Sequence, residues 1–156
     1  MAVNLSTEIV EASAAQRPVL ARLFELYQYD FSEFDGADVD EQGVYGTPHL
    51  ESYWRDADRH PFLLRAGDAW AGFALVRTGE PTDMAEFFVM RKYRRRGIAT
   101  AFARDVFARF PGAWQVREIE ANRPAQSFWR RAIPVAFDER DWGRGPMQVF
   151  VIPAAG

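Results

Sequence analysis

The 156-residue sequence contains no cysteine, two histidines and no long uninterrupted hydrophobic run. Without cysteine, disulfides, thiol nucleophiles, cysteine zinc sites and iron–sulfur clusters are excluded. His49 and His60 show no paired ligand spacing, so we expect no metal. No apolar segment approaches the roughly 20 residues of a membrane span, and residues 1–12 lack the basic start of a secretory signal. We therefore expect a cytoplasmic protein with no membrane partner.

The chain also lacks repeats, low-complexity tracts and serine/glycine linkers, which predicts one domain over residues 1–156. Charge is distributed unevenly along it. Residues 1–58 carry 12 acidic and 3 basic side chains, whereas residues 59–156 carry 10 acidic and 16 basic ones. This asymmetry favours a cationic ligand for the first part and an anionic ligand for the second. Two oppositely charged solvated faces are the alternative.

Hydrophobic periodicity indicates how helices and strands alternate. Apolar positions at helical spacing predict helices over residues 15–29, 49–58, 97–110 and 124–131. Short apolar or alternating runs predict strands over residues 8–12, 62–65, 70–77, 84–90, 114–120 and 147–152. Residues 31–46 are acidic, aromatic and broken by glycine, so we expect a surface segment there. This order predicts an α/β or α+β fold.

A basic turn joins the strand that ends near Met90 to the helix that follows. The first main-chain N–H groups of a helix lack partners and lie at the positive end of the helix dipole, which suits phosphate. Gly97 lets an anion approach the main chain because no Cβ intervenes. Arg94, Arg95 and Arg96 add positive charge. We therefore predict a pyrophosphate site. A nucleic-acid patch is the alternative, but no aromatic platform is interleaved, so we expect no nucleic-acid partner.

Two motifs here resemble those of the GNAT N-acetyltransferase superfamily. Arg94-x-x-Gly97-x-Ala99 is similar to the Q/R-x-x-G-x-G/A signature after the fourth strand, and residues 122–129 are similar to the family's N-x-x-A-x-x-F-Y segment. The resemblance implies a GNAT-like α/β domain, with a mixed central sheet of about six or seven strands flanked by helices. It also implies acetyl-CoA as co-substrate, a primary amine as acceptor, and pairing of exposed final strands in a homodimer.

The resemblance places acetyl-CoA at a splay between the fourth and fifth strands. It assigns the pyrophosphate to Arg94, Arg95, Arg96, Gly97, Ile98, Ala99 and Thr100. It assigns the pantetheine arm to Phe88, Val89, Met90 and Asn122, and the thiol end to Phe128 and Trp129. Asn122 is equally a normal helix N-cap before Pro124. We also expect free N–H groups near Val89 and Met90 to stabilise the oxyanion.

Amine acylation further needs a base and a proton for the leaving thiolate. Glu86 is the candidate base, because an apolar setting beside the thioester raises a carboxyl pKa. Asp83 is its rival, expected on the opposite face of the strand. Trp129 stands where the family commonly has the tyrosine that protonates the thiolate, and an indole N–H cannot act as a general acid. Tyr27, Tyr29, Tyr45 or water are the alternatives for that proton.

The acceptor end is predicted from the acidic, aromatic segment around residues 27–41. Aromatic rings beside carboxylates suit a cationic small molecule through ion pairing and cation–π contact. The predicted acceptor residues are Tyr27, Tyr29, Asp30 and Glu33. Because Trp129 departs from the family pattern, a non-catalytic acyl-CoA-binding or partner-binding module is the alternative function.

Overall fold

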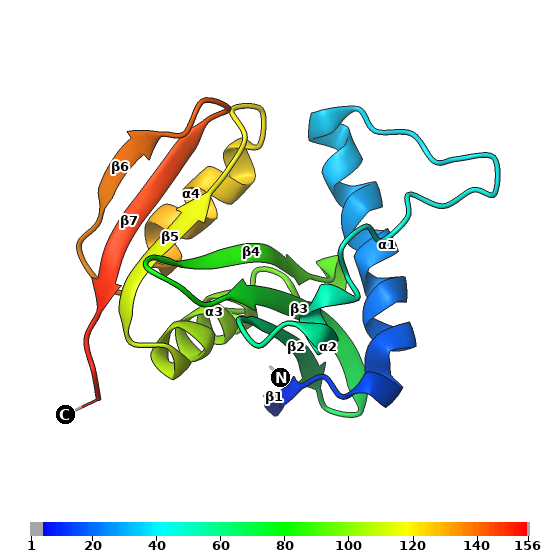
Figure 1. The fold of residues 1–156 in the computed structure, drawn as a ribbon, viewed down its shortest axis with the longest axis horizontal. Helices are drawn as coiled ribbons and strands as arrows, with labels where there is room; N and C mark the ends of the chain where they lie inside the picture. The colour runs from blue at the N-terminus through cyan, green and yellow to red at the C-terminus, as the bar shows by residue number, and fades with distance from the viewer. Residues whose placement is uncertain (1–4, 156) are drawn as a thin grey trace.

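Seven strands form one mixed sheet in the computed structural model, which describes residues 5–155 (Figure 1). Their spatial order is β1-β2-β3-β4-β5-β7-β6, and neighbours are antiparallel except for β4 and β5, which are parallel. The strands are β1 Thr7–Glu11, β2 Arg59–Ala66, β3 Ala69–Arg77, β4 Thr82–Val89, β5 Gly112–Arg117, β6 Asp138–Asp141 and β7 Pro146–Ile152. The predicted α/β fold with a mixed central sheet is confirmed.

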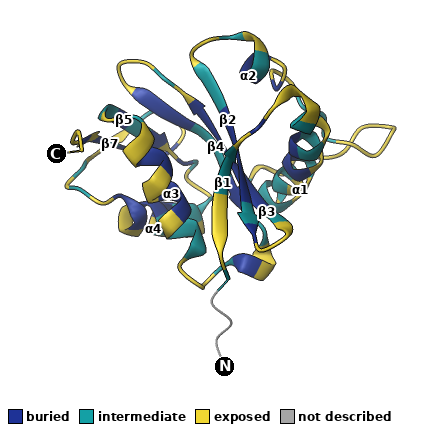
Figure 2. Cartoon of the chain, turned by 90° about the horizontal axis from the view of Figure 1, so that it is seen from below, coloured by how far each residue is buried: buried dark blue, intermediate teal, exposed yellow. Residues whose placement is uncertain are grey.

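Helices cover both faces of this sheet (Figures 1 and 2). They are η1 Ala14–Gln16, α1 Arg17–Asp35, α2 Ser52–Arg55, η2 Arg91–Tyr93, α3 Ile98–Arg109 and α4 Arg123–Ala132. On one face, Leu20 and Phe24 of α1 belong to the same buried cluster as Phe73 of β3. On the other face, Phe107 of α3 packs edge-on against Trp114 of β5. No helix within residues 5–155 is long and apolar enough to cross a bilayer.

Three elements differ from the sequence prediction. Helix α1 runs on to Asp35, because its apolar face continues through Phe31 and Phe34, whose rings contact each other. The helix expected over residues 49–58 is a single turn, α2. Strand β6 was not predicted, since its four residues are all charged and exposed and it exists only by pairing with β7. Charged residues are typical of a sheet edge, where they discourage pairing with another chain.

A buried polar cluster lies where β5 ends. Glu118 is 4% exposed, and its Oε1 accepts a hydrogen bond from Gln148 Nε2 at 2.9 Å. Within residues 5–155, Glu118 Oε2 and Gln148 Oε1 are buried without a hydrogen-bond partner. Burial raises the pKa of Glu118 to about 7, although the hydrogen bond from Gln148 opposes this rise. When the Glu118 carboxyl keeps its proton near neutral pH, it carries an O–H group. This O–H is a hydrogen-bond donor, which the unpartnered oxygens of Glu118 and Gln148 otherwise lack.

We expect the Glu118→Gln substitution to remove part of the pH dependence of folding stability. The carboxyl ionises near pH 4.5 when unfolded but near pH 7 when folded, so the free energy of unfolding falls as pH rises between these values. The difference corresponds to roughly 3 kcal/mol. Urea unfolding at pH 4.5, 6 and 8 measures it, with the exposed Glu120→Gln as control. Equal pH dependence in wild type and Glu118→Gln would show that Glu118 ionises normally.

Candidate active site

The sheet opens between β4 and β5, beside the predicted cofactor turn (Figure 1). Across the described chain, these parallel strands pair only at Thr82 with Trp114 and at Asp83 with Gln115. Beyond that point β4 continues to Val89 while staying paired with β3 along its other edge. The open edge of β4 offers main-chain hydrogen-bonding groups to an extended ligand. The splay that the resemblance implied between the fourth and fifth strands is therefore present.

Main-chain groups of an antiparallel strand alternate between its two sides. The Met90 N–H donates to a β3 carbonyl at 2.8 Å, so the main chain of Met90, and of Phe88 two residues earlier, is directed at β3. Phe87 and Val89 therefore present their N–H groups to the gap. Val89 suits an oxyanion donor or a pantetheine contact. The expectation of a free N–H at Met90 is wrong, because the alternation assigns that group to β3.

The turn between β4 and α3 leaves several main-chain N–H groups free. Arg95 and Gly97 adopt the left-handed conformation, with φ of 63° and 76°, and Gly97 is the N-cap of α3. In the described part of the chain, the N–H groups of residues 95–100 have no hydrogen-bond acceptor. Residues 95–97 are exposed. Because α3 directs the positive end of its dipole here, these amides suit an anion such as diphosphate.

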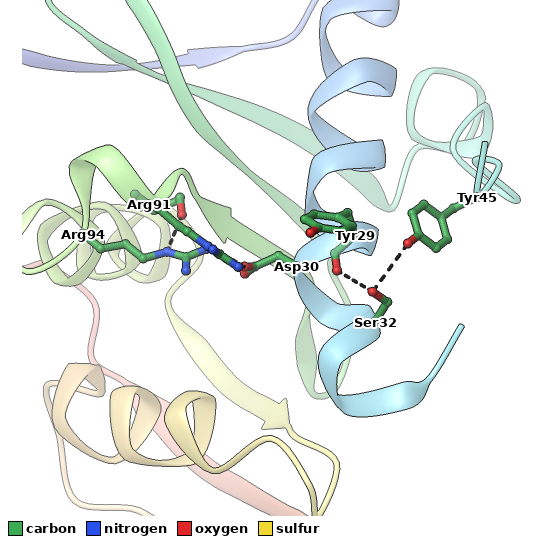
Figure 3. Close-up of polar contacts among 7 residues, drawn as sticks. Tyr29, Asp30, Ser32, Tyr45, Arg91 and Arg94 are labelled. Atoms are coloured by element: carbon green, nitrogen blue, oxygen red, sulfur yellow. Dashed lines mark hydrogen bonds and ion pairs between the residues drawn. The ribbon is translucent and has the colours of Figure 1, made fainter. Parts of the chain in front are cut away.

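Asp30 of α1 joins the same turn through two ion pairs (Figure 3). Its Oδ2 lies 2.7 Å from Arg94 Nη2, and its Oδ1 lies 2.9 Å from Arg91 Nη2. Arg94 Nε also donates to Val89 O at 2.8 Å. Burial alone would raise the pKa of Asp30, but the hydrogen bonds from Arg94 and Arg91 lower it overall. The Arg94 guanidinium is thus engaged with the protein itself, which the sequence did not predict.

Helix α4 begins at the N-cap Asn122 and packs two aromatic rings against β4. Asn122 Oδ1 accepts a hydrogen bond from Ala125 N at 3.2 Å, so the residue caps the helix as its sequence position suggested. Phe128 is half-buried and stacks on Phe87 of β4, with ring centroids 5.6 Å apart. Trp129 is 6% exposed and packs against Phe87. Trp129 therefore belongs mainly to the core beneath the sheet.

Glu86 lies on the α1 face of β4, where it accepts a hydrogen bond from the Tyr27 hydroxyl. Burial raises the pKa of Glu86, and the nearby Asp83 adds to this rise. The hydrogen bond from Tyr27 opposes it. Tyr27 donates to Oε2, and Oε1 has no hydrogen-bond partner among residues 5–155. A carboxylate with a raised pKa and one free oxygen has the properties of a general base.

Asp83 lies on the same face as Glu86, not on the opposite face as predicted. The β3–β4 register pairs Leu75 with Glu86 and Val76 with Met84, so Ala85 is an extra, bulged residue. A bulge reverses the alternation of side chains beyond it. Both Asp83 carboxylate oxygens are occupied, by Gln115 Nε2 at 3.4 Å and Arg117 Nη2 at 3.1 Å. The structure therefore favours Glu86 over Asp83 as the available carboxylate.

Comparison with known proteins identifies the family. Residues 20–133 match the model of the acetyltransferase (GNAT) family. The chain belongs to the GNAT acetyltransferase family. It is also 43% identical over 79 residues to mycothiol acetyltransferase of Rhodococcus erythropolis, a match that covers 49% of this chain but only 24% of that relative.

Solved structures share the fold of this GNAT chain. An acetyltransferase from Thermus thermophilus superimposes with a TM-score of 0.74 and 19% identity, covering 95% of this chain and 98% of that one. The ribosomal-protein-S18-alanine N-acetyltransferase from Escherichia coli superimposes with a TM-score of 0.65 and 14% identity, covering 97% of both. At such identities the likeness concerns the fold alone. GNAT acetyltransferases use acetyl-CoA, and the free amides after β4 lie where the family motif placed them.

The four predicted acceptor residues of the GNAT chain all lie on α1 but do not converge. Tyr27 and Asp30 contact β4 and the turn after it, respectively. Tyr29 is 64% exposed, and Glu33 is exposed as well. Of the tyrosines considered as thiolate acids, Tyr27 donates a hydrogen bond to Glu86. Tyr45 donates one to Ser32 (Figure 3). Within residues 5–155, no cluster of three acidic or histidine side chains is arranged to hold a metal ion.

Sequence reasoning missed the two contacts that connect α1 to β4 and its turn. Tyr27 and Glu86 are 59 residues apart, and Asp30 and Arg94 are 64 apart. One signal was available: Tyr27 and Asp30 are three positions apart in a helix, so they share a face. That spacing did not reveal which strand the face would meet.

Proposed function

We propose that this GNAT protein transfers an acetyl group from acetyl-CoA to a primary amine of a small cationic molecule within a ternary complex. The observation that carries the proposal is the row of unpartnered N–H groups at residues 95–100, which begins with the exposed residues 95–97 after β4, beside the open strand edge. A diphosphate bound there directs the pantetheine arm along β4. The Arg95 and Arg96 side chains are exposed and supply positive charge.

The residues along β4 suit the chemistry of acyl transfer. Acetyl-CoA supplies an activated thioester, whose carbonyl carbon forms the new bond to nitrogen while the carbon–sulfur bond breaks. The Val89 N–H stabilises the negative charge that develops on the carbonyl oxygen. Glu86 accepts the proton that the amine loses, directly or through one water. The thiolate takes its proton from water, because Trp129 has no acidic proton to give.

Charge and sequence similarity both support a small cationic acceptor. Glu86 presents one carboxylate oxygen that has no hydrogen-bond partner within residues 5–155, which favours an ammonium-bearing molecule. The similarity to mycothiol acetyltransferase favours a small-molecule acceptor. The fold, however, is also shared with a ribosomal-protein-S18-alanine N-acetyltransferase, whose name indicates a protein acceptor. Trp129 at the family's tyrosine position favours one second candidate, a non-catalytic acyl-CoA-binding module.

Acetyl-CoA turnover against a panel of amines tests these functions. The panel contains a polyamine, an amino sugar, free amino acids and a short peptide with a free N-terminus. Because the chain contains no cysteine, a thiol reagent reports only the coenzyme A that is released. We expect amine-dependent thiol release, with the acetylated product seen by mass spectrometry. Coenzyme A binding without turnover on any amine supports the binding module, and absence of binding contradicts both candidates.

A further inference from the structure

The Tyr27 side chain is held rigidly between α1 and the sheet. Its ring meets those of Phe24, Phe73 and Phe88 edge-on, with centroids 5.5, 5.6 and 5.9 Å away. These rings come from α1, β3 and β4, so the phenol is packed by three separate elements. A ring packed on several sides has one available orientation. The hydroxyl therefore has a defined direction, and it donates to Glu86 Oε2.

The Glu86 carboxylate receives its only hydrogen bond within residues 5–155 from this hydroxyl. Other charged or titratable groups that influence the carboxylate are Tyr53 of α2, Asp83 of β4 and Arg117 of β5. Arg117 is paired with Asp83, at 3.1 Å, and does not bond to Glu86. The orientation of the Glu86 carboxylate therefore depends on Tyr27. With Oε2 engaged, Oε1 is the oxygen left to accept a proton.

We propose that Tyr27 is a positioning residue for acetyl transfer, one that holds Glu86 by Oε2 so that Oε1 is presented to the acceptor amine. This inference rests on the proposed function and assigns Tyr27 a different task from the substrate contact that the sequence suggested. The Tyr27 phenol does not serve as the thiolate acid, since burial and the neighbouring Glu86 raise its pKa well above the ordinary value. Its proton stays in the hydrogen bond to Glu86.

The hydrogen bond also determines the pH at which the base becomes active. A donor to a carboxylate stabilises the ionised form and lowers its pKa. Burial raises the pKa of Glu86 and the Tyr27 hydrogen bond opposes this rise. Removing the hydroxyl therefore raises the pKa of Glu86 further, so a higher pH is needed to ionise it.

The Tyr27→Phe substitution tests the proposal, because it removes the hydroxyl and keeps the ring. We expect the acid limb of the kcat/KM profile to move to higher pH, because the ionised carboxylate loses the donor that stabilises it. The KM for acetyl-CoA should stay within about threefold, since the cofactor turn is untouched. Ser32→Ala is the control, because it removes a different hydroxyl from the same helix. The Ser32 hydroxyl donates to the Tyr29 carbonyl and accepts from the Tyr45 hydroxyl. An acid limb that stays in place in Tyr27→Phe, or moves equally in Ser32→Ala, overturns the proposal.

A second measurement separates this inference from the proposed function. Carbon-13 NMR of labelled glutamate follows the titration of the Glu86 carboxyl, whose signal is the one lost in Glu86→Gln. We expect the titration midpoint to rise in Tyr27→Phe whether or not an acceptor is known. An unchanged midpoint refutes the role of Tyr27 even if the enzyme is active. A raised midpoint in a protein that acetylates no amine supports the contact and refutes the proposed function.

Discussion

The Gly97→Glu variant is expected to lose coenzyme A binding while keeping its fold. Gly97 is the N-cap of α3, is exposed, and has open space around the position of a Cβ. A glutamate there brings a negative charge to the free amides of residues 95–100 and covers them with a side chain. Like charges in contact cost several kcal/mol, so we expect affinity to fall by at least ~100-fold. Isothermal titration calorimetry with coenzyme A measures this loss.

A matched control is available at Gly67, in the hairpin between β2 and β3. Gly67 has φ of 59° and also has no atoms near the position of a Cβ, as at Gly97 with φ of 76°. Both substitutions therefore introduce the same backbone strain, which costs about 1–2 kcal/mol, and both add one negative charge. Only Gly97→Glu should lose coenzyme A. Equal affinity in the two variants would contradict the assignment of the diphosphate to these amides.

Features specified by short stretches of sequence were predicted well. The β2–β3 hairpin, the strand before the basic turn and helix α3 all follow from apolar periodicity and from glycine at a turn. The free amides at residues 95–100 were predicted for the same reason, because the start of any helix leaves its first N–H groups unpaired. Each of these signals lies within a short stretch of residues, so each can be read from a single sequence.

Features that depend on pairing with another segment of the chain were not predicted. Strand β6 forms because β7 lies beside it, and the bulge at Ala85 appears only in the register with β3. The bulge explains the wrong face predicted for Asp83. The Arg94 guanidinium was expected at the diphosphate, but Asp30 on α1 engages it. In each case the segment is compatible with the observed structure, but a partner selects it: a neighbouring strand for β6 and for the bulge, and a residue 64 positions away for Arg94.

Two contacts between segments far apart in the sequence give α1 a role in the proposed site. Tyr27 contacts β4 at Glu86, and Asp30, one helical turn later, contacts the arginines that follow β4. The same helix therefore touches the candidate base and the cofactor turn. A shift of α1 would therefore change both contacts together.

The Glu86→Gln variant is expected to bind coenzyme A normally and to lose most of its acetyl-transfer activity. Glutamine keeps the shape of the side chain, and its oxygen still accepts the Tyr27 hydrogen bond, but it cannot accept a proton. General-base catalysis contributes ~100- to 10,000-fold, so we expect kcat to fall within that range. In the wild type the rate should rise with pH through the pKa of Glu86, which burial places above its ordinary value. The acid limb should be absent from the pH profile of Glu86→Gln.

Asp83→Asn separates the two carboxylates that the sequence left as rivals. Asp83 is 2% exposed and its carboxylate is bound by Arg117 and Gln115. Breaking a buried, charged hydrogen bond costs about 2 kcal/mol of folding stability, so Asp83→Asn should lower the midpoint of thermal unfolding. It should also keep the acid limb, because Glu86 remains to titrate, with that limb moved to lower pH since Asp83 raises the pKa of Glu86. If Asp83→Asn instead abolishes the limb while Glu86→Gln retains it, Asp83 is the base and Glu86 serves only to bind Tyr27.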